Sequence, residues 1–249
     1  MVTFPTPDAI APYWEHAFHL KDHLRGFLSL DAEALDARLQ KGQDDLAELG
    51  HRDFNWDQAQ EFYKDKVGEA YLFDLGAWHL TSQDYIGDTL RLIADYAKGN
   101  VLDFGGGIGT HSIAATRCAD VESVTYCDIN PISRDFVQYR SQQLQIQDTL
   151  SCHSQLAEDA VFDTIICFDV LEHLPDPVQQ LHEFKRLLKP SGMLITNWYF
   201  SKGTNGEYPF HLDDPSIIEA FFKTIQRNFV EVFHPYFITA RCYRATSLD

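Results

Sequence analysis

After residue 100 the chain alternates short apolar segments with segments of helical periodicity, and this alternation constrains the fold most. The apolar runs occupy residues 100–104, 121–128, 149–154, 162–169 and 192–200. Between them, helical spacing recurs in residues 133–145, 177–190 and 215–229. Continuous apolar strands alternating with helices are typical of a parallel sheet that is covered on both faces. We therefore expect an α/β fold with a mostly parallel sheet.

The two ends of the chain depart from this alternation. Residues 230–237 and 239–245 are expected to close the sheet as a terminal antiparallel pair. Residues 1–98 have helical periodicity, with Asp8 and Asp31 as expected N-caps of segments 9–30 and 32–49. Residues 50–55 interrupt this pattern, which resumes over 56–79 and 81–99. The sequence predicts a helical cap over 1–98 and a sheet domain over 99–249.

Charge and composition exclude several classes of protein. The net charge is −17 and no run is rich in Lys or Arg, so nucleic acid is not an expected partner. We expect no membrane span and, from the first residues, no secretory leader. Five scattered cysteines favour a reducing cytoplasm over disulfides or a zinc ribbon, with Cys127 and Cys167 buried as small apolar residues.

The stretch VLDFGGGIGT, residues 101–110, concentrates glycine where the first strand meets a helix. Glycine there allows a sharp turn and lets backbone N–H groups approach a ligand. Gly105, Gly107 and Gly109 follow a G-x-G-x-G rhythm, whereas a dinucleotide fingerprint would place a glycine at Thr110. A nicotinamide dinucleotide and S-adenosylmethionine are the two ligands to consider.

Asp103 extends the rhythm to D-x-G-x-G-x-G, and Asp128 ends the second strand nineteen residues after Gly109. With the segments FDVLEHLPDP and FKRLLKPSGMLIT, this series resembles class I S-adenosylmethionine-dependent methyltransferases over residues 100–245. The resemblance implies a Rossmann-like sheet and methyl transfer to a small-molecule acceptor. A protein methyltransferase, a nicotinamide oxidoreductase and a non-catalytic binding module remain alternatives.

The same resemblance implies the residues that hold the cofactor. The methionine end is expected at Asp103, Gly105, Gly107, Phe168 and Asp169, the ribose at Asp128 and the adenine at Ile129. The family's usual acid directly after the third strand is missing, so Ser154, Gln155 and Leu156 are the candidate partners of the adenine amino group.

Asp169, Glu172 and His173 form a D-x-x-E-H pattern that resembles ubiquinone-pathway O-methyltransferases, in which such groups hold a divalent ion. Asp169 is shorter than the glutamate of that pattern, so a site without metal is favoured. The alternative is a metal site formed by Asp169, Glu172 and His173, with His211 as a fourth ligand. His16, His19 and His23 lie on nearly one face of the expected first helix, where a polar surface is favoured over a metal site.

The acceptor is expected beyond the carboxyl ends of the strands. Two segments with many aromatic side chains can enclose it as lids: Tyr71, Phe73, Trp78, His79 and Tyr85 in the first, and Trp198, Tyr199, Tyr208, Phe210 and His211 in the second. Gly203 and Gly206 would let the second segment move. If a base is needed, His211 and His79 are the candidates, and a homodimer surface is the other role considered for the helical cap.

Overall fold

The fold is described from a computed structural model that covers residues 7–236 and 238–246. Residues 1–6, which bear on the expected absence of a leader, and Phe237, at the end of an expected strand, lie outside the described residues. Among the described residues, none of the helices is both long and apolar enough to cross a bilayer.

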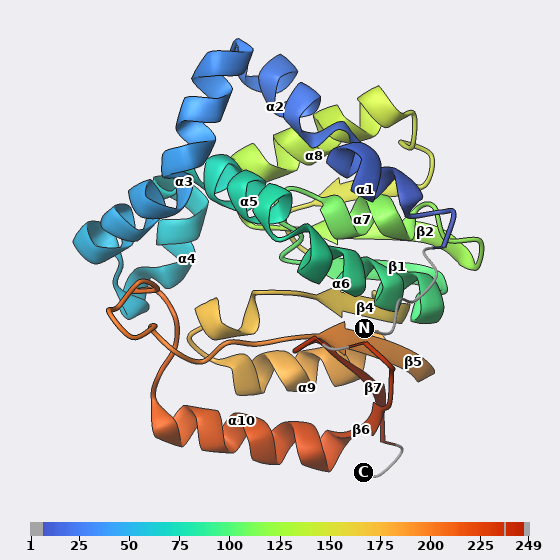
Figure 1. The fold of residues 1–249 in the computed structure, drawn as a ribbon. Helices are drawn as coiled ribbons and strands as arrows, with labels where there is room; N and C mark the ends of the chain where they lie inside the picture. The colour runs from blue at the N-terminus through green and yellow to red at the C-terminus, as the bar shows by residue number, and fades with distance from the viewer. Residues whose placement is uncertain (1–6, 237, 247–249) are drawn as a thin grey trace.

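A seven-stranded sheet runs through the molecule in the order β3-β2-β1-β4-β5-β7-β6 (Figure 1). The strands are β1 (Gly99–Phe104), β2 (Val121–Cys127), β3 (Leu150–His153), β4 (Phe162–Cys167), β5 (Leu188–Thr196), β6 (Phe229–Val232) and β7 (Arg241–Ala245). The first five pair in parallel, and β7 runs antiparallel to both β5 and β6. The expected Rossmann-like, mostly parallel sheet is confirmed, although β5 begins earlier than the apolar run suggested.

Helices cover both faces of the sheet. They are α1 (Ala11–His16), α2 (Leu20–Leu28), α3 (Ala32–Asp53), α4 (Ala59–Glu61), α5 (Ala70–Thr81), α6 (Gln83–Tyr96), α7 (Thr110–Ala115), α8 (Pro131–Leu144), α9 (Pro177–Leu187) and α10 (Pro215–Asn228). Successive strand residues enter different core clusters, since Val101 packs in the cluster of α6 to α8 and Leu102 in that of α9 and α10. Figure 1 shows α9 and α10 on the side away from the N-terminal helices.

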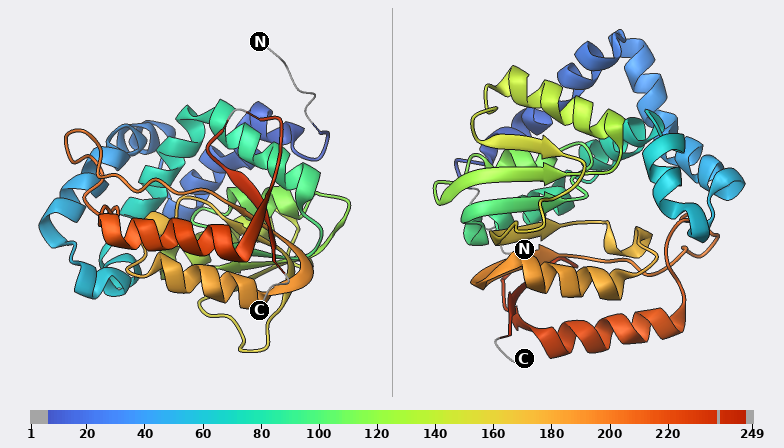
Figure 2. Two further views of the ribbon diagram at one scale, coloured as in Figure 1. Left: turned by 90° about the horizontal axis from the view of Figure 1, so that it is seen from below. Right: turned by 180° about the vertical axis from the view of Figure 1, so that it is seen from behind.

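The N-terminal helices share their core with the sheet. Phe18, Leu24 and Leu72 belong to the same buried cluster as Val101. A smaller cluster joins Leu46 and Phe62 to Phe210, so the loop after β5 lies against α3 and the residues that directly follow α4 (Figure 2). The helical region and the segment after β5 therefore pack on one another as well as on the sheet.

The first helical segment differs from the expectation in two ways. Residues 9–30 do not form one helix, because Ala17, Phe18 and His19 have positive φ angles that separate α1 from α2. His16, His19 and His23 therefore do not lie on one regular helix, yet their rings remain adjacent, with centroids 3.7 Å apart for His16 and His19 and 6.0 Å apart for His19 and His23. Asp8 is not an N-cap, since α1 begins at Ala11 and has no side-chain cap, whereas the expected cap Asp31 accepts a hydrogen bond from the Ala34 N–H.

Two further boundaries were expected differently. Helix α3 continues through residues 50–53, where an interruption was expected. Residues 56–66 form a 3-10 turn, the short helix α4 and a π-turn (Phe62–Lys66) in place of one regular helix. Both differences follow from tertiary packing, because a Cβ at Gly50 would contact Phe210 and the Phe62 side chain is buried.

Arg140 explains why the left-handed break between α1 and α2 is retained. Its fully buried guanidinium donates to the carbonyl oxygens of Ile108, at 2.7 Å, and Phe18, at 3.2 Å. It also contacts the carbonyl of Ala17 and the imidazole of His23, which is buried. Burial lowers the pKa of Arg140 to about 9. One side chain thus ties the N-terminal helices to Ile108, which lies within the glycine-rich turn.

We expect Arg140→Met to lower the free energy of unfolding by about 3 kcal/mol, because several buried carbonyls lose their donor. Denaturant unfolding measures this difference. Arg227→Met on the exposed face of α10 is the matched control, with an expected change within about 0.5 kcal/mol. Equal effects of the two substitutions would contradict the structural role of Arg140.

Candidate functional site

The glycine-rich turn between β1 and α7 combines left-handed backbone with close packing. Gly105 and Gly107 have φ angles of 69° and 51°, which side chains with a Cβ rarely adopt. A Cβ at Gly105 would lie 2.4 Å from Val170 Cγ2, and one at Gly107 would lie 2.5 Å from Leu75 Cδ1. The glycines therefore make room for neighbouring side chains. Their N–H groups are bonded within the protein, that of Gly105 to the Cys127 carbonyl and that of Gly107 to Asp128.

Asp128 follows β2 and fixes this turn to the neighbouring strand. Its Oδ2 accepts a hydrogen bond from the Gly107 N–H at 3.0 Å, and its Oδ1 accepts one from the Asn130 N–H at 2.8 Å. Burial raises the pKa of Asp128 to about 6, against the opposing effect of these N–H groups. Each carboxylate oxygen keeps a further lone pair, so Asp128 can also accept from ligand hydroxyls.

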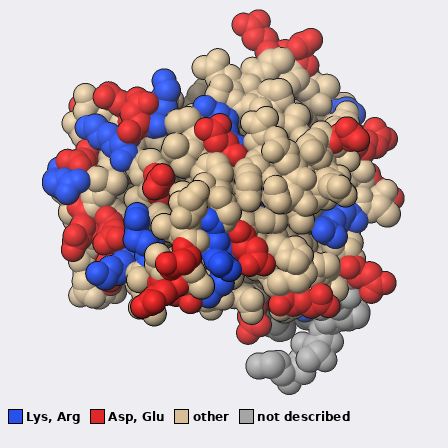
Figure 3. All heavy atoms as spheres, turned by 90° about the horizontal axis from the view of Figure 1, so that it is seen from above, with Lys and Arg blue, Asp and Glu red and all other residues tan. Residues whose placement is uncertain are grey.

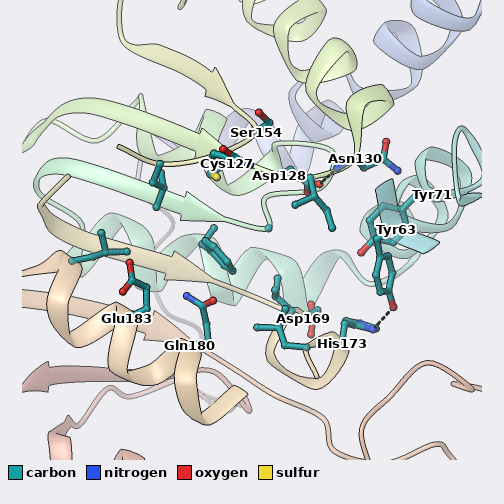
Figure 4. Close-up of a pocket in the computed structure, with 18 residues that line it drawn as sticks. Tyr63, Tyr71, Cys127, Asp128, Asn130, Ser154, Asp169, His173, Gln180 and Glu183 are labelled. Carbon is teal, nitrogen blue, oxygen red and sulfur yellow. Dashed lines mark hydrogen bonds between the residues drawn. The ribbon is translucent and has the colours of Figure 1, made fainter. Parts of the chain in front are cut away.

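A cavity of about 350 Å³ opens at the carboxyl ends of β1, β2 and β4 (Figure 4). Ligands of open α/β sheets bind at this edge. The predicted cofactor residues that line the cavity are Gly105, Asp128, Ile129 and Asp169, together with the adenine candidates Ser154, Gln155 and Leu156. Residues from distant parts of the sequence are thus brought to one concave surface.

Three other predicted cofactor residues are buried and do not line this cavity. Asp103 accepts a hydrogen bond from Ser112 Oγ, and burial raises its pKa to about 7. Phe168 packs against His111, with ring centroids 4.6 Å apart. Gly107 directs its N–H to Asp128. These residues support the turn, and their contact with the methionine end stays a prediction.

The enclosing aromatic pocket takes a different form from the one expected. Of the aromatic and histidine side chains expected to enclose the acceptor, Tyr71 alone lines the described cavity. Phe73 is buried in the core, and Trp198 lines a separate groove beside Phe222. His79 is buried and packs against His111, with ring centroids 5.6 Å apart. Helical and strand periodicity cannot distinguish aromatic core residues from pocket residues.

Tyr63, which the sequence did not single out, forms the end of the cavity with Tyr71 and His173 (Figure 4). A hydrogen bond of 2.8 Å joins the Tyr63 hydroxyl to His173 Nδ1. Burial, and then His211, lower the pKa of His173 well below its usual range, while the Phe210 carbonyl opposes this shift. His173 is therefore a neutral imidazole near neutral pH.

His211 lies behind His173, with ring centroids 4.6 Å apart, and does not line the cavity. Its Nδ1 contacts the Ser201 carbonyl at 3.0 Å, and burial lowers its pKa to about 4. Glu172 accepts the Tyr199 N–H at Oε1, while its buried Oε2 has no partner among the described residues. Burial, and then Asp169, raise the pKa of Glu172 to about 8.

Glu172, His173 and His211 offer ligand atoms that all lie within 4.8 Å of one another. Nitrogen and carboxylate donors suit a divalent transition ion, and the unpartnered Glu172 Oε2 suits either a proton or a cation. Asp169, the first residue of the D-x-x-E-H pattern, is outside this group. Its carboxylate accepts from Asn197 Nδ2 at 2.7 Å, and Asn197 also donates to the Tyr85 hydroxyl.

The sequence matches a family described as a methyltransferase domain over residues 77–202, which is half of the chain. The chain belongs to the class I S-adenosylmethionine-dependent methyltransferases. S-adenosylmethionine is the cofactor that this family implies. The match begins within α5 and ends just after β5, so it includes the glycine-rich turn, Asp128 and the Glu172–His173 turn.

Similar proteins include ubiquinone biosynthesis O-methyltransferases. The one from Coxiella burnetii is 30% identical over 133 residues, covering 52% of this chain and 45% of the relative. That from Actinobacillus pleuropneumoniae (serotype 5b) is 32% identical over 107 residues, covering 38% and 43%. The methyltransferase thus matches less than half the length of these curated relatives.

Two solved structures share the fold of the methyltransferase. Mitomycin 7-O-methyltransferase MmcR superposes with a TM-score of 0.56 at 14% identity, covering 96% of this chain and 74% of that chain. An O-methyltransferase family protein from Burkholderia thailandensis has a TM-score of 0.55 at 16% identity, covering 78% and 65%. At these identities the similarity concerns the fold alone.

Sequence reasoning missed several residues of the site. Tyr63 lies in a π-turn with no distinctive spacing, so nothing in the sequence marks it. Asn130 caps α8 and lines the cavity, and its buried Nδ2 has no hydrogen-bond partner among the described residues. Its position before a proline is a recognisable helix start. Asn197 accepts a hydrogen bond from the Asp169 N–H. Its position as a polar residue directly after an apolar strand is the sequence feature that could have indicated this contact.

We expect Asp128→Asn to weaken the binding of S-adenosylhomocysteine by about 1–3 kcal/mol, because the substituted amide removes a charged acceptor of hydroxyl protons. Titration calorimetry measures the affinity, and a thermal unfolding scan reports any loosening of the turn. Asp135→Asn, on the exposed face of α8, is the control and should bind normally. An unchanged affinity of Asp128→Asn would refute its predicted role at the ribose.

Proposed function

We propose that this methyltransferase transfers the methyl group of S-adenosylmethionine to a hydroxyl group of a small molecule. The observation that carries the proposal is a single cavity with two chemically different ends. Asp128 and Ile129 line the end predicted for the adenosine, and Tyr63, Tyr71 and His173 form the other. We assign the second end to the acceptor.

The charge of the cavity supports a sulfonium ligand over a dinucleotide. Asp128 and Asp169 line it, as does Glu183, whose charge is paired with Arg186, and none of the described lining residues is Lys or Arg. Carboxylates favour the positive sulfonium and ammonium groups of the cofactor, whereas the pyrophosphate of a nicotinamide dinucleotide would meet charges of its own sign. The oxidoreductase alternative is therefore disfavoured.

The chemistry asked of the protein is modest, because a sulfonium is already a good leaving group. Holding the acceptor oxygen in line with the methyl group can supply much of the acceleration. A hydroxyl acceptor must also lose its proton. Tyr63 is placed to accept that proton while its own passes to His173 Nδ1, since the lowered pKa of His173 leaves its imidazole neutral and able to accept a proton. His211 packs against the His173 ring on the side away from the cavity, so we assign it a positioning role and not the role of the base.

The covering segments favour a small acceptor over a protein. The loop after β5 packs on α3 and on the turn after α4, and Gly203 and Gly206 have positive φ angles that suit a hinge. We propose that this loop and the helical region 1–98 act together as the lid, while a role of these helices in a homodimer stays a prediction. On the face in Figure 3, Lys and Arg lie among Asp and Glu without forming a basic patch.

An ion held by Glu172, His173 and His211 would lower the pKa of an acceptor hydroxyl.

Transfer of a labelled methyl group tests the proposal. The protein is incubated with methyl-labelled S-adenosylmethionine and, separately, with a panel of small phenols, carboxylic acids and amines or with a protein extract. We expect label in a phenol and none in protein. Label confined to protein would favour the side-chain methyltransferase, and binding of a nicotinamide dinucleotide without binding of S-adenosylhomocysteine would favour the oxidoreductase.

The same assay resolves the metal alternative. We expect transfer to continue after treatment with a chelator, because proximity and the Tyr63–His173 pair require no ion. Loss of transfer that returns on addition of a divalent ion would assign Glu172, His173 and His211 as its ligands.

We expect Tyr63→Phe and His173→Gln each to lower kcat for a phenolic acceptor about 100-fold, since both interrupt the same proton path. Affinity for S-adenosylhomocysteine should stay unchanged, which separates this effect from a loss of folding. His182→Gln, on the exposed face of α9, is the control. A normal kcat in Tyr63→Phe would contradict the proposed proton path.

A further inference from the structure

Helix α9 forms a wall of the cavity that the sequence did not associate with a ligand. Gln180, Glu183 and Leu187 line the cavity from this helix. Figure 4 shows Gln180 and Glu183 pointing into the cavity from the side opposite Ser154. Spacings of three and four residues place all of them on one helical face.

The connection between β3 and β4 explains why α9 is accessible to a ligand. Residues 154–161 join these parallel strands without a helix, although such crossovers usually contain one. Arg186 on α9 donates to the Glu158 carbonyl at 2.8 Å and so holds this link beside the helix. The space between the strand ends and α9 is left for the cavity.

Gln180 and Glu183 differ in what they can still bind. Glu183 is paired with Arg186, which donates to both of its carboxylate oxygens and lowers its pKa. The buried Nε2 of Gln180 has no hydrogen-bond partner in the described structure. An unpaired buried donor is unfavourable, so a ligand that pairs with it gains affinity. Gln180 is thus the available polar group of this wall.

The surrounding side chains suit a flat base with a polar edge. Ile129, Leu156 and Phe104 offer apolar surface around the space that Gln180 faces. An amide presents one donor and one acceptor side by side, which match the N1 acceptor and the 6-amino donor of adenine. By contrast, the alternative candidates Ser154 and Gln155 are exposed and are not fixed by a buried contact of their side chains.

We propose that Gln180 recognises the edge of the adenine base. It would bind the 6-amino group in place of the acid that the family usually has directly after β3. This inference rests on the proposed binding of S-adenosylmethionine in the cavity. The base then lies between the end of β2 and α9. Its polar edge is bound by a side chain of a helix, in place of a side chain of the loop after β3.

The test compares S-adenosylhomocysteine with its analogue in which hydrogen replaces the 6-amino group. We expect the wild-type protein to bind S-adenosylhomocysteine roughly tenfold more tightly than the analogue, the value of one hydrogen bond. In Gln180→Leu this ratio should fall to about one. Gln155→Leu, the same substitution on the opposite wall, should keep the wild-type ratio.

Gln180→Glu serves as a second variant of the same shape, in which the donor to N1 is lost. It should bind both ligands more weakly than wild type while retaining their ratio, since the carboxylate still accepts from the 6-amino group. A wild-type ratio in Gln180→Leu, or its loss in Gln155→Leu, would overturn the inference while leaving the proposed function intact. Failure of the wild-type protein to bind either ligand would instead overturn the proposed function and this inference with it.

Discussion

The hydrogen bonds that Asp128 accepts from Gly107 and Asn130 connect the main parts of the site. Parallel strands end at one edge of a sheet, so the turn after β1 and the acid after β2 must meet there. The bond to Gly107 holds the turn in its left-handed form, and the bond to Asn130 holds the start of α8. A single buried carboxylate thereby shapes the backbone of the cavity and also remains able to accept from a ligand.

The N-terminal helices form the other half of the site and are inseparable from the sheet in their packing. Arg140 joins the break between α1 and α2 to Ile108 within the glycine-rich turn, and Leu75 of α5 packs directly on Gly107. The same helical region brings Tyr63 to His173. Because these contacts share one core with the sheet, the end of the cavity assigned to the acceptor depends on the whole chain.

The carboxyl groups in and around the site are buried, and no Lys or Arg among the described residues lines the cavity beside them. Asp103, Asp128 and Glu172 all have raised pKa values because they are removed from water. A cationic ligand relieves this cost better than a neutral or anionic one. The loss of the sulfonium charge on methyl transfer would remove part of that attraction, which favours release of the product.

The sequence by itself determined the α/β class, the positions of the strands and the place of the glycine turn, because these depend on local periodicity and on backbone freedom. It also indicated Asp128, whose position at a strand end follows from the order of the motifs. Tertiary structure alone decided that residues 9–30 break at Ala17, that Tyr63 and not His211 lines the cavity, and that Gln180 faces into it. Each of these depends on a contact between distant segments, such as Arg140 with Phe18 or Tyr63 with His173, and sequence periodicity carries no information about which distant groups meet.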